Sequence, residues 1–332
     1  MPLLTLCITK KEKIMKKCFL FFAAATVLCS CATQFAITSG EESLSALTKV
    51  TDGEEPSITP FGGDGGKNLF YATRENYMYY NICKKENAFS NAVASKTSGK
   101  NLNYAPAYCE ATDKIAFRCQ NEGSRTSDIY LMSASKGKAM IQATDTPDAF
   151  ENNPSFSPDG KLLAYDKQSY AYGYTNPFSF SPYLIEKSEI WVKNLETGEN
   201  TLIGNGYQPT ISPDGTKIVY VKYAADARSC SLWVMDIDGD NQIQLTDAKR
   251  GYAHAPKWSP DGERIVFQST KKDKRDADLY VINVDGDELV QLTKNTSHDG
   301  SPYWSNDGYI YFVSDRGGQM NKYQIWRFKI EE

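Results

Sequence analysis

Histidine is nearly absent from this chain, with 2 among 332 residues, and several familiar catalytic patterns are missing. Without a Gly-x-Ser-x-Gly sequence, an α/β serine hydrolase has no candidate nucleophile turn. Without a Cys-x-x-Cys pair, neither a zinc site nor thioredoxin-type redox chemistry is supported. The glycine-rich residues 62–66 fall where a hairpin turn is expected and open no helix, so they predict a turn and not a phosphate loop. The sequence therefore predicts a protein that is not an enzyme.

Basic residues are also in the minority. Of 37 basic and 41 acidic residues, five Lys and one Glu lie in residues 1–30, which leaves 32 against 40 and a net charge of −8 for the remainder. A protein that binds nucleic acid normally carries a basic patch. The balance therefore gives no reason to expect nucleic acid as a partner.

The amino terminus reads as a targeting signal, residues 1–30, in which Met15 offers a second start. Lys16 and Lys17 precede an apolar run at 18–28 that is short for a membrane span. The sequence Leu28-Cys29-Ser30-Cys31 resembles a bacterial lipobox, which implies cleavage before Cys31 and a lipid on its thiol. The alternative is an ordinary secretory signal with incidental cysteines.

Residues 31–42 are expected to be a lipid-anchored tether, and the propeller described below occupies residues 43–332. No acidic residue closely follows Cys31, a pattern that resembles lipoproteins retained in the periplasm. We therefore expect a bacterial envelope protein, held by lipid at the outer membrane and facing the periplasm.

A strand–turn–strand unit with the sequence Pro-x-(aromatic)-Ser-Pro-Asp-Gly is repeated along the chain. Its first prolines, at positions 60, 106, 154, 209, 256 and 302, lie 46, 48, 55, 47 and 46 residues apart. Proline presets φ in the turn, and Asp-Gly supplies an acceptor and a residue that tolerates positive φ. A period of this length with several short strands predicts an all-β fold, a six-bladed β-propeller.

The closure of the ring can also be predicted. Residues 43–50 resemble the outermost strand of a blade, as found at 289–296, whereas the chain ends after a third strand at 324–330. The N-terminal strand is therefore expected to complete the last blade and to leave no open seam. The five tryptophans recur at equivalent strand positions, which predicts packing between blades.

Blade three carries a long insertion between its second and third strands. It is rich in aromatic residues: Tyr170, Tyr172, Tyr174, Phe178, Phe180 and Tyr183. His254 and His298 each precede a unit proline, which places both in loops on the same face of the ring. The insertion is either a cluster that covers this face or a binding patch, since tyrosine is frequent in interfaces. The histidines either bind a ligand or satisfy backbone groups around the channel.

No cofactor is expected. Asp236, Asp238 and Asp240 resemble half of a calcium loop, but they fall in a hairpin turn and lack the distal glutamate of an EF-hand. Cys83, Cys109, Cys119 and Cys230 follow the signal, and their spacing specifies no disulfide pairing.

The repeated units resemble the TolB-type, or PD40, β-propeller repeats over about residues 43–330. Relatives include the translocation protein TolB, the propellers of prolyl oligopeptidases and oligogalacturonate lyases. The chain departs from each of them, because no room is left for an extra domain and two histidines cannot form the lyases' metal site.

The resulting expectation is a non-catalytic, monomeric, lipid-anchored propeller that docks an envelope protein or peptide through its loop face. The alternative is a carbohydrate-binding or degenerate lyase-like lipoprotein, in which the same aromatic residues stack on sugars.

Overall fold

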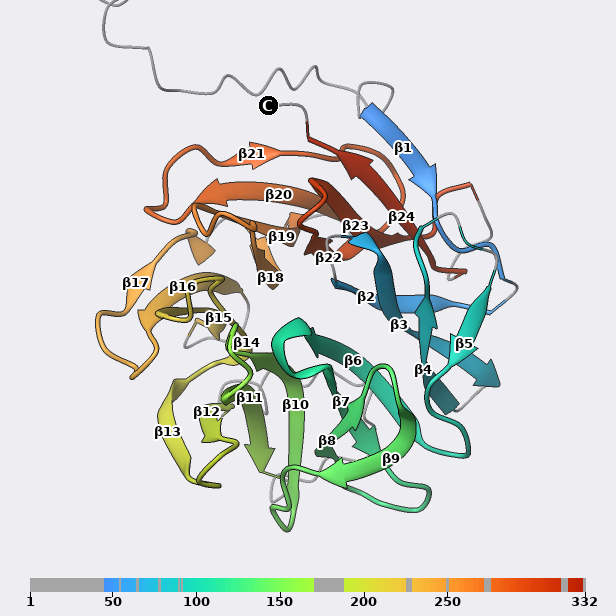
Figure 1. The fold of residues 1–332 in the computed structure, drawn as a ribbon. Helices are drawn as coiled ribbons and strands as arrows, with labels where there is room; N and C mark the ends of the chain where they lie inside the picture. Colours follow the sequence, from blue (N-terminus) through green and yellow to red (C-terminus); the bar gives the residue numbers. More distant parts are fainter. Residues whose placement is uncertain are drawn as a thin grey trace, which may run out of the picture. The chain divides into compact units, whose positions relative to one another are not determined.

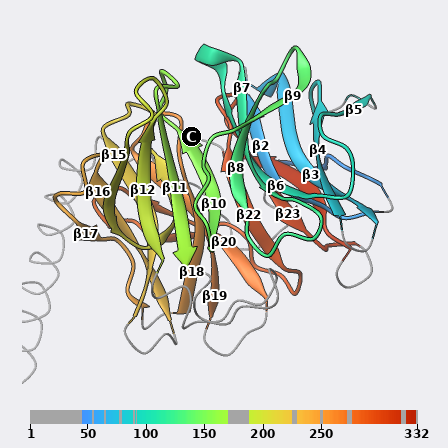
Figure 2. The ribbon, with the colours of Figure 1, turned by 90° about the horizontal axis from the view of Figure 1, so that it is seen from below.

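The computed structural model describes residues 45–330, except for 54, 64–65, 77–78, 89, 91, 170–187, 225–228, 249–250, 272–275 and 318–321. Within these residues, 24 strands are arranged as six groups of four antiparallel strands, the blades of a β-propeller (Figure 1). Single parallel bridges join blade one to blade two and blade four to blade five. Seen from the side, the strands run from one face of the ring towards the other (Figure 2). The prediction of an all-β propeller is confirmed, and the six groups of strands are consistent with the predicted six blades.

The first three blades follow one another in chain order, each beginning with its innermost strand. Blade one contains β2 (Ser57–Gly63), β3 (Asn68–Asn76), β4 (Tyr79–Lys85) and β5 (Val93–Ser95). Blade two contains β6 (Leu102–Cys109), β7 (Lys114–Gln120), β8 (Asp128–Ser133) and β9 (Gly137–Gln142), with the 3-10 helix η3 (Glu110–Thr112) in its first turn. Blade three contains β10 (Ala149–Phe156), β11 (Leu162–Ser169), β12 (Glu189–Asn194) and β13 (Asn200–Asn205).

The second half of the ring repeats this arrangement. Blade four contains β14 (Tyr207–Ile211), β15 (Lys217–Tyr223), β16 (Cys230–Asp236) and β17 (Ile243–Gln244). Blade five contains β18 (Gly251–Trp258), β19 (Arg264–Lys271), β20 (Ala277–Asn283) and β21 (Val290–Gln291). Blade six contains β22 (Asp299–Trp304), β23 (Tyr309–Ser314), β24 (Gln324–Lys329) and, from the start of the chain, β1 (Ser45–Lys49).

Strand β1 closes the ring by pairing antiparallel with β24, as predicted. Thr51, two residues beyond the end of β1, accepts a hydrogen bond on its hydroxyl from the Ile325 N–H at 2.9 Å. A threonine at the same place accepts the equivalent bond in four other blades: Thr97, Thr144, Thr246 and Thr293. The N-terminal segment therefore reproduces the chemistry of an outermost strand in detail.

Six separate hydrophobic clusters lie between neighbouring blades, one at each junction. The junction of blades six and one, for example, joins Leu69 and Tyr71 to Tyr311 and Ile325. The tryptophans belong to these clusters, as predicted: Trp191, Trp233, Trp258, Trp304 and Trp326. Burial between blades is the main stabilising contribution, because each sheet covers the next one.

The repeated Ser-Pro-Asp-Gly sequence forms one kind of hairpin turn. In blade three the Ser157 hydroxyl donates to the Asp159 carboxylate at 2.6 Å and accepts from the Leu162 N–H at 2.9 Å. Gly160 lies at a φ of 71°, which a residue with a side chain adopts at a cost. The same bonds recur in blades four and five. This local chemistry explains why the motif could be read from sequence.

Two further sequence features can be placed. The thiols of Cys83, Cys109, Cys119 and Cys230 are buried and unpaired by disulfides. Among the residues described above, no helix is long and apolar enough to span a membrane.

Removal of residues 43–50 should leave β24 as an exposed edge, so we expect a lower thermal midpoint and a tendency to aggregate. A milder change, Thr51→Val, removes two buried hydrogen bonds, from the Ile325 N–H and to Gln324 Oε1, and should lower the free energy of unfolding by about 2 kcal/mol in urea. Thr293→Val removes the bond from the Leu279 N–H in blade five and should cost about half as much. A deletion variant that unfolds at the same midpoint as the intact protein would show that β1 does not close the ring.

Candidate binding site in the central channel

The innermost strand of every blade breaks its register once, at the unit proline. The residue before this proline has a positive φ of 47–54° in all six blades: Thr59, Ala105, Asn153, Gln208, Ala255 and Ser301. Positive φ is uncommon outside glycine, and an α-type backbone is further disfavoured before proline. Each pair therefore forms a strained bulge, and the six bulges share one geometry.

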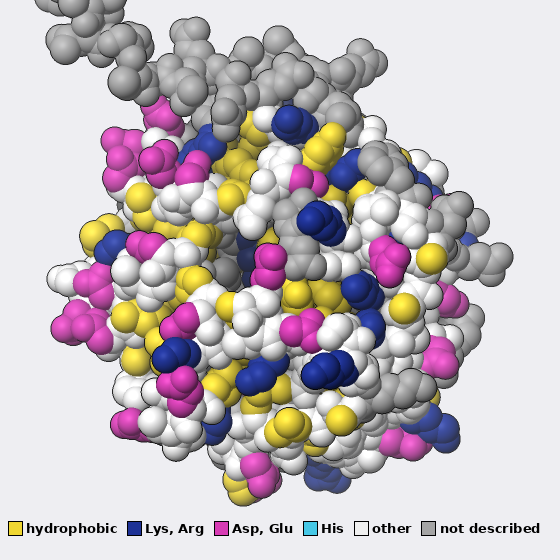
Figure 3. All heavy atoms as spheres, viewed as in Figure 1, with side chains coloured by type: hydrophobic (Ala, Val, Ile, Leu, Met, Phe, Trp, Pro, Cys, Tyr) yellow, Lys and Arg dark blue, Asp and Glu magenta, His cyan; other side chains and the backbone are white. Residues whose placement is uncertain are grey.

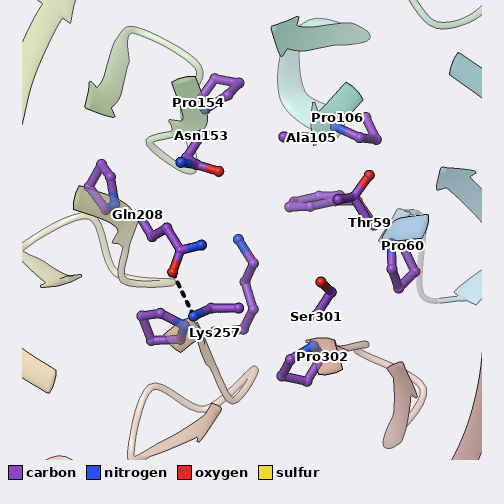
Figure 4. A pocket seen from close by; sticks show the side chains of 14 residues that line it. Thr59, Pro60, Ala105, Pro106, Asn153, Pro154, Gln208, Lys257, Ser301 and Pro302 are labelled. Carbon is purple, nitrogen blue, oxygen red and sulfur yellow. Dashed lines mark hydrogen bonds between the residues drawn. The ribbon is translucent and has the colours of Figure 1, made fainter. Parts of the chain in front are cut away.

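These bulges line the central channel. Proline is tolerated there because the innermost strand is a sheet edge, where no ladder hydrogen bond is lost. The remaining cavity has a volume of about 80 Å³. Figure 4 shows the residues around it: Thr59, Pro60, Phe61, Ala105, Pro106, Asn153, Pro154, Gln208, Pro209, Ala255, Pro256, Lys257, Ser301 and Pro302.

Side chains from one blade hold the strained backbone of the next. The Gln208 N–H donates to Asp166 Oδ1 at 3.0 Å. The Ala255 N–H donates to Gln208 Oε1 and the Ser301 N–H to Gln268 Oε1, both at 2.7 Å. Each bond crosses a junction between blades, so the bulges are fixed by the closed ring as well as by their own strand.

The same bonds orient two amides in the channel. Asn153 Nδ2 donates to Asp166 Oδ1 at 2.7 Å. The Asn153 side-chain oxygen therefore points towards the cavity. Because Gln208 Oε1 is taken by the Ala255 N–H, the Gln208 NH₂ group points inward (dashed bond, Figure 4). Burial raises the pKa of Asp166, although these hydrogen bonds oppose the shift.

Among the described residues, Lys257 is the one charged side chain that lines this cavity. Its ammonium extends into the channel (Figure 4) and lies 3.4 Å from Thr210 Oγ1. No carboxylate of the described residues is within ion-pair distance of it. Desolvation lowers its pKa from the usual 10.5 to about 8. The channel therefore holds a cation that no described carboxylate neutralises.

His254 lies within β18 and not in the loop before it, where the sequence had placed it. Its Nδ1 is 2.6 Å from Tyr207 Oη, and its ring stacks on Tyr252 with centroids 6.2 Å apart. Burial lowers the pKa of His254 to about 4, so the imidazole is neutral at pH 7. Cys230 lies 3.6 Å from Nε2, but burial raises its pKa to about 12, which keeps the thiol protonated. This cluster packs beside the channel and does not line its cavity.

His298 has a different setting, in the loop before β22 as expected. Its N–H donates to Asp315 Oδ1 at 2.9 Å, and its ring meets Tyr323 edge to face. The aromatic candidates Tyr170, Tyr172, Tyr174, Phe178, Phe180 and Tyr183 lie outside the described residues, as does Cys31. Their proposed contacts remain predictions.

The acidic turn at Asp236, Asp238 and Asp240 connects β16 to β17. Asp236 binds the Lys217 ammonium at 2.7 Å and the Asn241 amide at 2.6 Å. Asp238 Oδ1 accepts the Asp240 N–H at 3.1 Å. In the part of the chain that is described, no three His, Cys, Asp or Glu side chains are grouped to hold a metal.

Sequence reasoning missed Asn153, Gln208 and Lys257, although a signal was available. The residues that follow the six unit prolines are Phe61, Ala107, Ser155, Thr210, Lys257 and Tyr303. Only one of these carries a charge, at a position where every other blade has an apolar or neutral side chain. A charged residue in one copy of a repeat, at a position that is uncharged in the other copies, indicates a function that the other copies do not share.

Residues 206–332 match the family model described as the TolB beta propeller domain. The Tol-Pal system protein TolB of Francisella tularensis subsp. tularensis (strain WY96-3418) is 28% identical over 140 residues, 41% of this chain and 28% of that protein. The chain is therefore similar to TolB-type PD40 propellers, and the family match lies in its second half. The match spans little more than a quarter of the curated relative's length.

Solved structures agree with this TolB-like propeller in fold. TolB from Acinetobacter baumannii superposes with a TM-score of 0.62 at 18% identity, covering 80% of this chain and 65% of that one. The putative TolB from Agrobacterium tumefaciens gives 0.61 at 18% identity, covering 85% and 93%. An oligogalacturonate lyase in complex with manganese gives 0.59 at 16% identity, covering 86% and 93%.

Replacement of Lys257 in the TolB-like propeller by methionine should stabilise the fold. A pKa that falls from 10.5 to about 8 on folding corresponds to at most about 3 kcal/mol of cost at pH 7. Because the side chain is partly exposed, we expect a gain of about 1–2 kcal/mol in the free energy of unfolding. The folded state binds fewer protons between pH 8 and 10.5, so the wild type should recover this difference as the pH rises through that window.

Urea unfolding of both proteins at pH 7 and pH 10 measures the effect. Lys161→Met, which removes a lysine exposed at a hairpin turn, is the matched control and should change stability little. A Lys257→Met protein less stable than the wild type at pH 7 would mean that the ammonium is neutralised within the fold.

Proposed function

We propose that this chain is a non-catalytic, lipid-anchored protein of the bacterial envelope that docks a protein or peptide through its propeller. The lipid on Cys31 would hold it at the outer membrane on the periplasmic side. The docking surface would be the face that bears His298 and the predicted aromatic insertion, Tyr170 to Tyr183, together with the mouth of the channel.

The unneutralised ammonium of Lys257 in the channel carries this proposal. A partly buried charge without an ion-pair partner among the described residues costs stability, so its presence on a rigid frame is better explained by binding than by packing. The frame is preorganised, because the bulges at Gln208, Ala255 and Ser301 are held by bonds between blades. A preorganised site loses less entropy when a partner binds.

The charge of the channel is local. On the face drawn in Figure 3, Lys and Arg side chains alternate with Asp and Glu and with apolar side chains, and no broad field of one sign covers it. Such a surface suits selective protein contacts better than binding to a polyanion. The comparisons support the same class of function, since a relative that is 28% identical over 140 residues is named a Tol-Pal system protein.

Carbohydrate handling is the second candidate, because the Lys257 cation could also pair with the carboxylates of polyuronates. The oligogalacturonate lyase fold gives it further support. However, no three His, Cys, Asp or Glu side chains of the described residues, His254 included, are grouped to hold a metal. Metal-dependent cleavage of polyuronates that disappears on changing His254 and His298 would establish this alternative.

Photo-crosslinking in cells tests the docking proposal. A crosslinking amino acid at position 298 or 174 should capture one discrete protein, identified by mass spectrometry of membrane fractions. Position 263 serves as the control. It lies in the hairpin turn between β18 and β19, at the other end of the strands from the loop that holds position 298, and should capture no protein or different proteins. Abundant, folded protein without a specific product from positions 298 and 174 would contradict docking at this face.

The anchor is tested separately. Cys31→Ala should abolish incorporation of labelled fatty acid and release the protein from washed membranes into the soluble fraction. Cys29→Ala, two residues away, should leave both properties unchanged. Membrane association that persists in Cys31→Ala would show that another part of the chain is responsible.

A further inference from the structure

Lys257 lies among hydrogen-bond donors of the channel, and no carboxylate of the described residues pairs with its ammonium. Asp166 is the carboxylate bonded to the channel amides, and it accepts bonds from Asn152, Asn153 and Gln208. The ammonium of Lys257 contacts only the neutral Thr210 hydroxyl among the described residues. The positive charge therefore faces the cavity without a counterion.

Two further groups extend this donor set. The Gln208 NH₂ points into the same cavity, because its oxygen is held by the Ala255 N–H. The Thr59 hydroxyl, on the opposite wall, is buried and has no hydrogen-bond partner. A buried polar group without a hydrogen-bond partner costs free energy. A ligand atom that bonds to it would remove this cost.

We propose that the channel receives one carboxylate, from an acidic side chain of the docked protein, between Lys257 and Gln208. This inference rests on the proposed docking function and specifies its chemistry. An ammonium and an amide NH₂ side by side can bind the two oxygens of one carboxylate through charge-assisted hydrogen bonds. The Asn153 oxygen points inward as well, which discourages a second anion and limits the site to a single charge.

The cavity has room for an acidic side chain. Its volume of about 80 Å³ is several times the roughly 10–15 Å³ that one water occupies. The occupant is taken to be an Asp or Glu side chain because the proposed function is the docking of a protein or peptide, and a uronate is the alternative that the experiment below tests.

Titration of the full mature chain with acetyl-glutamate amide, followed by NMR of lysine side chains, tests this proposal without knowledge of the partner. Binding should shift the Lys257 and Gln208 side-chain signals and raise the apparent pKa of Lys257 by about one unit or more, because a carboxylate favours the charged ammonium. Acetyl-glutamine amide, the neutral matched probe, should produce no such shift.

Lys257→Met should weaken binding of acetyl-glutamate amide by about tenfold or more, whereas Lys161→Met should bind it as the wild type does. A titration with galacturonic acid in place of acetyl-glutamate amide distinguishes a uronate sugar from an acidic side chain as the source of the carboxylate. The proposal is overturned if the probe leaves the Lys257 and Gln208 signals unchanged, if binding survives in Lys257→Met, or if galacturonic acid binds more tightly than acetyl-glutamate amide.

The two proposals can fail separately. If a partner is captured from position 298 and binds Lys257→Met with unchanged affinity, the docking proposal stands and the carboxylate site is rejected. Carboxylate binding that depends on Lys257, with no crosslinked partner, would reject docking at the loop face and retain the chemistry of the channel.

Discussion

A positive-φ residue followed by proline, in the innermost strand of each blade, is the constraint on which the channel depends. Such a backbone costs about 1–3 kcal/mol at each position, so it persists only where the surrounding structure holds it. Here the support comes from other blades: Asp166 holds Gln208, Gln208 holds Ala255, and Gln268 holds Ser301. The hydrophobic clusters at all six junctions keep these partners in place, and β1 closes the ring that makes the arrangement possible.

The repeated backbone and the individual side chains have separate roles. Six bulges of common geometry make a rigid wall, while the residue after each proline is free to differ: it is phenylalanine, alanine, serine, threonine, lysine or tyrosine. Ser155 and Thr210 use their hydroxyls to bond the next blade, and Tyr303 packs on Phe61. Lys257 alone among these six places a charge in the cavity. Function can therefore change with one side chain while the frame is conserved in geometry.

The same distinction explains what similarity to known proteins can contribute. TolB proteins and an oligogalacturonate lyase share this architecture at 16–18% identity, a similarity that shows the fold alone. His254 illustrates what the individual side chains add, because here it is bonded to Tyr207 and packed against Tyr252. The chemistry has to be derived from the groups that face the cavity.

The sequence by itself determined the all-β class, the number of blades, the hairpin turns and the strand that closes the ring. These features follow from short-range chemistry, such as Ser-Pro-Asp-Gly turns and terminal threonines, repeated often enough to be recognised. Only the tertiary structure decided that Asn153 and Gln208 present an oxygen and an NH₂ group to the channel, that no described carboxylate pairs with Lys257, and that His254 bonds Tyr207. Each of these depends on contacts between residues that are distant in the chain or in different blades, and no local pattern specifies which side chains will meet there.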